Sequence, residues 1–165
     1  MPRLHQKDLS KVRAEHHDKK IVFCSGVFDL THPGHILFFE DCRLHGDILV
    51  VGVGSDSVIK RDKGDLRPIL NEQMRLKMVE NLRPVDYAFI IEPLVVTETL
   101  DQLKPIFADL RPDVYIMNAD ASNIAYRKQM LGHLPLRIVV LDRTCPPEYD
   151  AVSTSTLIEK IKKLY

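Results

Sequence analysis

Short apolar runs alternate with amphipathic stretches along most of the chain. The runs are rich in β-branched and aromatic residues and are bounded by polar residues, glycine or proline, which is typical of strands. One run, residues 47–53, is almost continuously apolar and is therefore expected to be a central strand of a parallel sheet that is covered on both faces. The five predicted strands are residues 21–24, 47–53, 85–91, 113–117 and 136–141.

Patterns of helical period lie before, between and after these strands. Gly46 is placed to end the helix after the first strand as its C′ residue. Asn71 is placed to cap a helix whose apolar face carries Met74, Met78, Val79 and Leu82. Pro105 is expected to kink a longer helix. The predicted helices are residues 8–16, 34–45, 55–61, 72–82, 97–110, 123–131 and 153–164.

This alternation predicts an α/β protein. We expect a doubly wound, five-stranded parallel sheet with helices on both faces, in the Rossmann-like manner. The chain has 165 residues, which suits one domain, and neither a repeat nor a linker divides it. We therefore expect a single domain over residues 1–165, with residues 1–19 as an N-terminal helical extension. Ligands of such sheets bind beyond the carboxyl ends of the strands.

Charge and cysteine content narrow the classes of function. The chain carries 23 basic and 23 acidic residues, so its overall charge does not favour nucleic acid or an acidic membrane as a partner. Its three cysteines lack C-x-x-C spacing, which argues against a disulfide framework or a zinc knuckle. The N-terminal residues lack the apolar segment of a signal peptide, and no apolar run approaches transmembrane length. We expect a cytoplasmic protein that binds neither nucleic acid nor a membrane.

Residues 26–35, Gly-Val-Phe-Asp-Leu-Thr-His-Pro-Gly-His, join the first predicted strand to a helix. The first N–H groups of a helix lack intrahelical partners and lie at the positive end of its dipole, so this junction is suited to bind an anion. His32 and His35 are three residues apart and are expected to project toward the same side, beside the anion. Gly34 lets a ligand approach the backbone closely. The segment therefore predicts a polyphosphate site.

Other charged and polar residues follow the later strands, so they are expected at the same edge of the sheet. A nucleoside triphosphate carries several negative charges, and attack on its α-phosphorus develops more charge on the surrounding oxygens. Oriented cations and helix N–H groups stabilise such a transition state. The candidates are Lys60, Lys63 and Arg67 after the second strand, Asn118 and Asp120 after the fourth, and Arg143, Ser153, Thr154 and Ser155 after the fifth.

The segment at residues 26–35 resembles the cytidylyltransferase-like family of nucleotidyltransferases, because it matches every fixed position of the pattern G-x-F-D-x-x-H-x-G-H. The resemblance covers the chain from Lys20 onward. Arg67-Pro68-Ile69 and Arg111-Pro112-Asp113 resemble the heptose-phosphate branch, whereas Arg143-Thr144 and residues 152–155 resemble the R-T-x-G-I-S-T-T signature of glycerol-phosphate cytidylyltransferases.

The chain departs from these relatives at two places. Residues 145–151 are inserted between the two halves of the R-T signature. At residues 117–121, Met-Asn-Ala-Asp-Ala, only Asp120 fits the patterns of both branches. Ala121 stands where both branches have an aromatic residue, which removes a stacking or packing surface from the loop beside the base.

The resemblance also implies roles for individual residues. His32 and His35 are expected to contact the α- and β-phosphates and to stabilise the transition state, with Lys63 and Arg143 gripping the triphosphate or the substrate phosphate. Asp29 either holds Mg²⁺, directly or through water, or is a turn residue that hydrogen-bonds nearby backbone amides. Arg75 is expected to be structural. The remaining expected contacts are Gly26, Val27, Phe28, Gly34, Asn118, Asp120, Ser153, Thr154 and Ser155 with the nucleotide, and Lys60 and Arg67 with a phosphate or the acceptor substrate.

We therefore expect an enzyme that transfers CMP from CTP to a small phosphorylated acceptor, a polyol or sugar phosphate, and releases pyrophosphate with the help of Mg²⁺. The small residue at Ala121 favours a pyrimidine base over a purine. One alternative is an adenylyltransferase that uses ATP on a sugar phosphate or related ester. Another is a non-catalytic nucleotide-binding regulatory protein. The resemblance also implies a homodimer.

Overall fold

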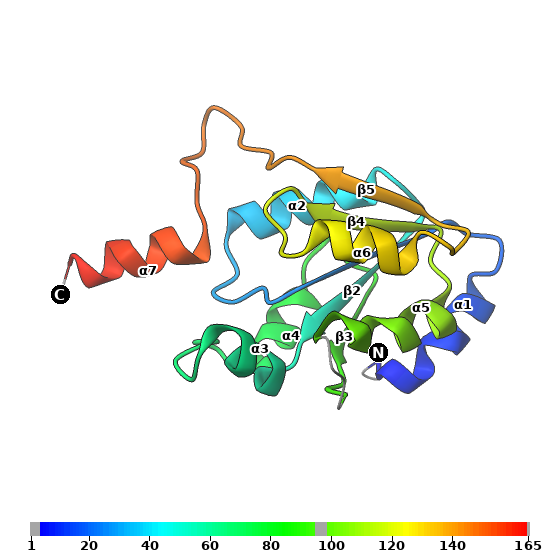
Figure 1. The fold of residues 1–165 in the computed structure, drawn as a ribbon. Coiled ribbons are helices and arrows are strands. Elements are labelled where there is room, and N and C mark those ends of the chain that lie inside the picture. Colours follow the sequence, from blue (N-terminus) through cyan, green and yellow to red (C-terminus); the bar gives the residue numbers. More distant parts are fainter. Residues whose placement is uncertain (1–3, 95–98, 165) are drawn as a thin grey trace.

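A computed structural model describes residues 4–94 and 99–164 of the chain. Its five strands form one parallel sheet in the order β3-β2-β1-β4-β5 (Figure 1). This confirms the predicted doubly wound sheet. The strands are β1 (Ile21–Gly26), β2 (Ile48–Gly54), β3 (Tyr87–Ile91), β4 (Val114–Asn118) and β5 (Arg137–Leu141).

Alternate side chains of the central strands enter two hydrophobic cores, one on each face of the sheet. On β1, Phe23 belongs to the core beneath α1, α5 and α6, whereas Val22 and Cys24 belong to the core beneath α2 and α4. The ring of Phe23 packs against that of Tyr115 with centroids 5.7 Å apart. The covering helices are α1 (Leu9–Glu15), α2 (Pro33–Arg43), α4 (Glu72–Val79), α5 (Lys104–Leu110) and α6 (Ile124–Leu131).

The predicted N-terminal extension packs into the domain itself. The 3₁₀ turn η1 (Gln6–Asp8) leads into α1, whose Leu9 and Val12 are buried in the same core as α5. The amide oxygen of Gln6 accepts a hydrogen bond from the backbone N–H of Glu92 just after β3 (2.8 Å). These residues therefore complete one face of the sheet.

Two helices lie at the carboxyl-terminal edge of the sheet. These are α3 (Asp56–Lys63), directly after β2, and α7 (Thr154–Lys162), which extends away from the rest of the chain in Figure 1. No residue of α7 is buried, and Ile161 and Leu164 are more than half exposed. Among the described residues, no helix is long and apolar enough to cross a membrane.

Three local predictions were wrong. Helix α2 ends at Arg43, and Gly46 does not adopt the left-handed C′ conformation. The glycine is needed there because an added Cβ would lie 2.7 Å from the carbonyl oxygen of Lys20. In α4, Met74 and Met78 of the predicted apolar face are about half exposed, whereas Val79 is buried as predicted, together with Leu76.

The third concerns the predicted helix at residues 97–110, whose start lies outside the described residues. Thr99–Leu103 is a separate 3₁₀ helix, η2, and α5 begins at Lys104. Pro105 therefore stands in the first turn of α5, where its missing N–H costs no hydrogen bond, and it does not kink a longer helix.

Candidate active site

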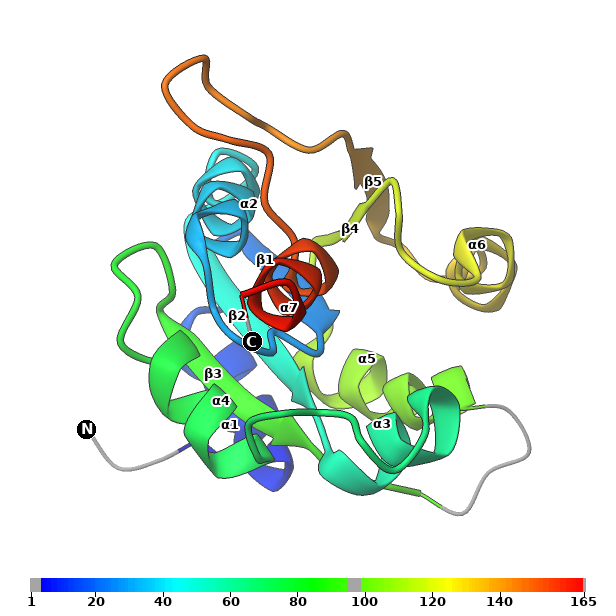
Figure 2. The same ribbon diagram turned by 90° about the vertical axis from the view of Figure 1, so that its left-hand side faces the viewer.

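A cavity of about 470 Å³ lies at the carboxyl ends of the strands. Its wall combines the segment after β1, the carboxyl end of α3, the loop after β4 and the amino end of α7. Figure 2 looks toward this edge, with α7 seen end-on in front of β1 and β2. The volume lies within the usual range for small-molecule sites.

The two histidines of the segment after β1 stand together at the start of α2. His32 is the N-cap residue and Pro33 occupies the first helical turn, where its fixed φ favours helix initiation. The imidazole rings of His32 and His35 stack with centroids 3.9 Å apart and an interplanar angle of 26°. His32 is 7% exposed, and its buried Nδ1 has no hydrogen-bond partner in the described part of the chain. Both rings line the cavity.

The surroundings keep both imidazoles neutral near pH 7. Burial, reinforced by the neighbouring His32 and Arg143, lowers the pKa of His35 to about 4 despite the opposing effect of Asp29. Burial and Arg143 also lower the pKa of His32. Nδ1 of His35 accepts a long hydrogen bond from the backbone N–H of His32 (3.4 Å). The proton of the neutral His35 ring is therefore on Nε2, where it can donate to a ligand.

Phe28 forms the floor beneath these rings. Its backbone adopts the left-handed conformation with φ 52°, and its ring lies 4.9 Å from that of Phe39 and 5.5 Å from that of His35. A Cβ added to Gly26 would lie 2.8 Å from Phe28 Cζ. Gly26 and the unusual backbone of Phe28 therefore place the aromatic ring under His35.

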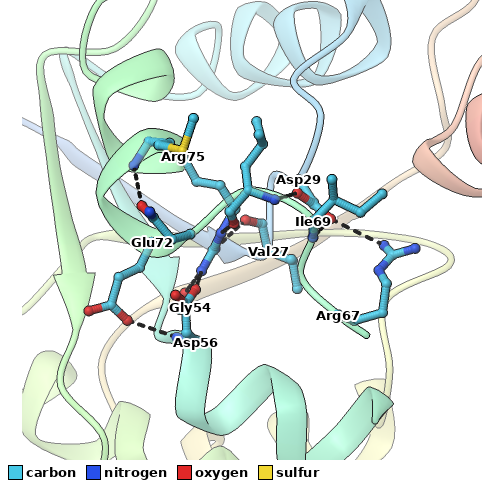
Figure 3. Close-up of polar contacts among 11 residues, drawn as sticks. Val27, Asp29, Gly54, Asp56, Arg67, Ile69, Glu72 and Arg75 are labelled. Atoms are coloured by element: carbon cyan, nitrogen blue, oxygen red, sulfur yellow. Dashed lines mark hydrogen bonds and ion pairs between the residues drawn. The ribbon is translucent and has the colours of Figure 1, made fainter. Parts of the chain in front are cut away.

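Asp29 anchors the loop between α3 and α4 to this segment (Figure 3). Its carboxylate is 1% exposed and accepts hydrogen bonds from the backbone N–H groups of Ile69 (2.8 Å) and Leu70 (2.9 Å). Arg67 of the same loop lies 3.7 Å from the carboxylate, and its buried Nε has no partner among the described residues. The amides that Asp29 binds belong to a distant loop and not, as the turn role had predicted, to its own turn, and Mg²⁺ binding stays a prediction.

Arg75 joins the ends of two strands to the same loop (Figure 3). Its side chain is fully buried and donates to the carbonyl oxygens of Val27 (2.6 Å), Gly54 (2.7 Å) and Leu70 (2.9 Å). Its charge is balanced by Asp56, whose Oδ1 lies 2.7 Å from Nη2. This arrangement confirms the structural role expected for Arg75, because the N–H groups of the guanidinium donate hydrogen bonds to atoms of the protein itself.

The two halves of the R-T signature meet despite the inserted residues. Nη1 of Arg143 donates to the carbonyl oxygen of Val152 (3.4 Å), and the hydroxyl of Thr144 hydrogen-bonds Asp41 on α2. The contact of Arg143 with Val152 brings the two ends of the inserted segment, residues 145–151, close together. The segment belongs to the long loop between β5 and α7 in Figure 1. Arg143 lines the cavity and forms an ion pair with Asp120.

Helix α7 presents its amino end to the cavity. The hydroxyl of Ser153 caps the helix by accepting from the backbone N–H of Thr156 (3.1 Å). The hydroxyl of Thr154 donates to the carbonyl oxygen of Asp29 (2.9 Å), which joins α7 to the segment after β1. The amino ends of α2 and α7 therefore lie at one cavity, and both helix dipoles favour an anion there.

The structure brings most of the predicted residues together. Lys60 and Gly34 do not line the cavity; Lys60 is exposed on α3, and Gly34 lies in the first turn of α2. Sequence reasoning missed Ser25, Gln102 and Arg127, because none belongs to a recognisable motif. Predicted residues in the wall are Gly26, Val27, Phe28, Asp29, His32, His35, Lys63, Arg67, Asn118, Asp120, Arg143, Ser153, Thr154 and Ser155.

Carboxylates in the wall do not form a protein metal cage. No group of three or more His, Cys, Asp or Glu residues suited to a metal ion occurs in the part of the chain that the structure describes. Asp29 accepts hydrogen bonds from the loop between α3 and α4, and Asp120 forms an ion pair with Arg143. This donor set suits Mg²⁺ carried by phosphate oxygens and water better than a fully protein-ligated ion.

The parallel sheet, the paired histidines and the two helix amino ends define an α/β protein built to bind a phosphate-rich ligand at its strand ends. The model of the cytidylyltransferase-like family matches residues 23–160, and the chain belongs to this family. The match confirms the expectation of a nucleotidyltransferase domain.

Curated relatives include the bifunctional protein HldE of Helicobacter pylori strain HPAG1, which is 38% identical over 152 residues, and that of Aliarcobacter butzleri, which is 39% identical over 101 residues. The first match covers 92% of this chain and 29% of the relative, and the second 60% and 21%. The chain therefore spans less than a third of the length of these relatives.

Solved structures show the same fold. The lipopolysaccharide core biosynthesis protein of Thermoplasma volcanium superposes with a TM-score of 0.61 at 28% identity, covering 80% of this chain and 99% of that protein. The pantoate-beta-alanine ligase of Francisella tularensis superposes with a TM-score of 0.66 at 19% identity, covering 98% of this chain and 76% of the ligase, and supports the fold alone.

Proposed function

We propose that this domain transfers AMP from ATP to the phosphate group of a sugar phosphate and releases pyrophosphate. The observation that carries the proposal is the neutral, stacked pair of His32 and His35 at the amino end of α2, in one cavity with Arg143 and the amino end of α7. Each of these groups donates hydrogen bonds or positive charge, and all converge where a triphosphate would lie.

The reaction needs no covalent enzyme intermediate. An oxygen of the acceptor phosphate attacks the α-phosphorus of the nucleotide in line and forms the new P–O bond. The bond from the α-phosphorus to the oxygen bridging to the β-phosphate breaks, and pyrophosphate leaves with the electron pair. Mg²⁺ bound to the phosphates would neutralise part of their charge. Nε2–H of His35 donates to a phosphate oxygen, and Arg143 and Lys63 hold the leaving pyrophosphate.

Adenylyl transfer is supported better than the cytidylyl transfer that the sequence favoured. The curated relatives share the name HldE, and the solved relative at 28% identity is named as a lipopolysaccharide core biosynthesis protein. The heptose-phosphate resemblance of Arg67-Pro68-Ile69 agrees with these relatives. The preference for CTP rested on the resemblance of Met117 and Arg143-Thr144 to cytidylyltransferases and on the small side chain of Ala121. Ala121 also packs against the core beneath α5 and α6, so its small size has a packing reason as well.

A matrix of nucleotides and phosphate esters tests the proposal. ATP and CTP, each with Mg²⁺, are combined with sugar 1-phosphates, heptose 1-phosphate among them, and with glycerol 3-phosphate, and pyrophosphate release is measured. Mass spectrometry identifies the product. We expect an ADP-sugar from ATP and a sugar 1-phosphate. Faster turnover of CTP would restore the cytidylyl alternative, and nucleotide binding without turnover of any ester would support a regulatory protein.

A further inference from the structure

The cavity extends across the strand ends from one face of the sheet to the other. His32 and His35 reach it from the α2 side, where Phe28 packs in the core beneath α2 and α4. Ser25, Gln102 and Arg127 line it from the side of η2 and α6, whose neighbouring residues pack in the other core. Figure 2 shows α2 and α6 on opposite sides of the strand ends. The histidine half suits the triphosphate, and the family resemblance places the base beside residues 117–121. The wall formed by Ser25, Gln102 and Arg127 is then left for the acceptor.

Gln102 is the most unusual group of this second half. Its side chain is 7% exposed and its Oε1 is buried, yet this oxygen has no hydrogen-bond partner within residues 4–94 and 99–164. A buried polar atom without a partner costs stability, and most such atoms in proteins find one. The neighbouring Leu103 is 2% exposed in the core, which holds this turn in place. Because Gln102 lines the cavity, a donor from a bound ligand can supply the missing hydrogen bond.

Ser25 and Arg127 add a hydroxyl and a hydrogen-bond donor to the acceptor at Gln102. The hydroxyl of Ser25 lies 3.4 Å from that of Tyr115, and the same tyrosine hydroxyl accepts a hydrogen bond from Nη1 of Arg127. Nε of Arg127 donates to the carbonyl oxygen of Ser122 (3.1 Å), so the guanidinium is held at two points. Its Nη2 makes no hydrogen bond with the residues that the structure describes. Leu103, 2% exposed and also in the cavity wall, contributes an apolar surface beside Gln102.

This half of the cavity thus offers an acceptor at Gln102, a donor at Arg127 and a hydroxyl at Ser25 above an apolar surface. Such a pattern matches a polyhydroxylated ring, which has alternating hydroxyl groups and C–H faces. We propose that this half is the acceptor subsite and that Oε1 of Gln102 accepts a hydrogen bond from one hydroxyl of the sugar. The inference rests on the proposed function, because it assumes that the acceptor phosphate points toward the histidines.

The test compares the wild type with Gln102→Leu, which keeps much of the side-chain volume and removes the acceptor. Gln73→Leu, at an exposed position of α4, is the matched control. The probes are heptose 1-phosphate and its monodeoxy analogues, with kcat/KM measured by pyrophosphate release. A site built to hydrogen-bond a hydroxyl strongly rejects an analogue without it. We expect the wild type to discriminate against one analogue by about 100-fold or more.

In Gln102→Leu, this discrimination should fall to within about threefold, while the other analogues keep their ranking. The Kd for ATP should stay within about twofold, because the triphosphate binds in the other half. The variant should unfold no more easily than the wild type, since an unpaired buried oxygen has been removed. Gln73→Leu should retain the full discrimination. Equal loss on every analogue, unchanged discrimination or weaker ATP binding would overturn the inference.

Calorimetry tests binding at the acceptor subsite independently of turnover. Heptose 1-phosphate is titrated into the protein saturated with a non-hydrolysable ATP analogue. Binding that is weakened in Gln102→Leu but kept in Gln73→Leu supports the subsite, even if no ester is turned over and the proposed function fails. Absence of binding to the wild type overturns the subsite. If Gln102→Leu does not fold, Ser25→Ala provides the same comparison from the neighbouring hydroxyl.

Discussion

The rings of His32 and His35 stack 3.9 Å apart although neither residue is paired with a carboxylate in the described part of the chain. Two imidazolium ions at this distance would repel each other, and burial further disfavours the charged forms. The pair is therefore suited to donate from neutral rings to an anion that brings its own negative charge. Binding a triphosphate would supply the partner that these histidines lack.

Replacing His35 by alanine should lower turnover by about two to four orders of magnitude, because a preorganised donor to the transition state is lost. The fold should persist, since the ring lies at the cavity wall. The measurement is kcat for pyrophosphate release by the purified variant, with circular dichroism to verify folding. His133→Ala, at an exposed position, is the control and should keep normal turnover. Near-normal turnover in a folded His35→Ala variant would contradict the catalytic role.

The lowered pKa of His35 predicts a dependence of stability on pH. Its folded pKa is about 4 and its ordinary value 6.5, so the unfolded chain binds more protons between these values. The free energy of unfolding should therefore rise with pH across this window, and the stabilisation is lost as the pH falls from 6.5 to 4. Urea titrations of the wild type and of His35→Gln at several pH values test this. The glutamine variant should show a shallower slope, and equal slopes would refute the assignment.

Arg143→Ala should weaken binding of the triphosphate by roughly 10- to 100-fold, the usual effect of losing a charge-assisted contact. Calorimetry with ATP and Mg²⁺ at matched salt measures it. Asp120→Asn frees Arg143 from its ion pair and should not weaken binding to the same extent. The control is Arg137→Ala, which removes an arginine of β5 that does not line the cavity. Unchanged affinity and turnover in Arg143→Ala would show that the R-T alignment was misleading.

Arg75→Met should lower the free energy of unfolding by about 3–5 kcal/mol. The change leaves Asp56 without its partner and three carbonyl oxygens without their donor, a typical cost for breaking a buried ion pair. Chemical denaturation gives this value directly. Arg83→Met removes an exposed arginine and should change stability by no more than about 0.5 kcal/mol. A similar effect in both variants would contradict the structural role of Arg75.

The homodimer implied by the family resemblance stays a prediction. Light scattering at micromolar concentration should give about twice the chain mass of 18.9 kDa. A monomeric mass over this concentration range would contradict it.

The sequence by itself determined the fold class and the histidine half of the site. Strands and helices follow from apolar periodicity, which is local, and the spacing of His32 and His35 acts within one helical turn. The N-cap Asn71 was visible for the same reason, because capping needs only the next three residues. Parallel strands then bring their following segments to one edge, so the broad location of the cavity also followed from the order of elements.

Tertiary structure decided what depends on distant partners. Arg75 is buried because carbonyl oxygens of Val27 and Gly54 meet it there, and no local pattern indicates that. Met74 is exposed because a different face of α4 packs against the sheet. Gln102 lines the cavity because η2 packs against the core, and Gln102 belongs to no sequence motif. Burial of a charged side chain such as Arg75 costs free energy unless distant atoms pair with it, and only the folded chain brings those atoms together.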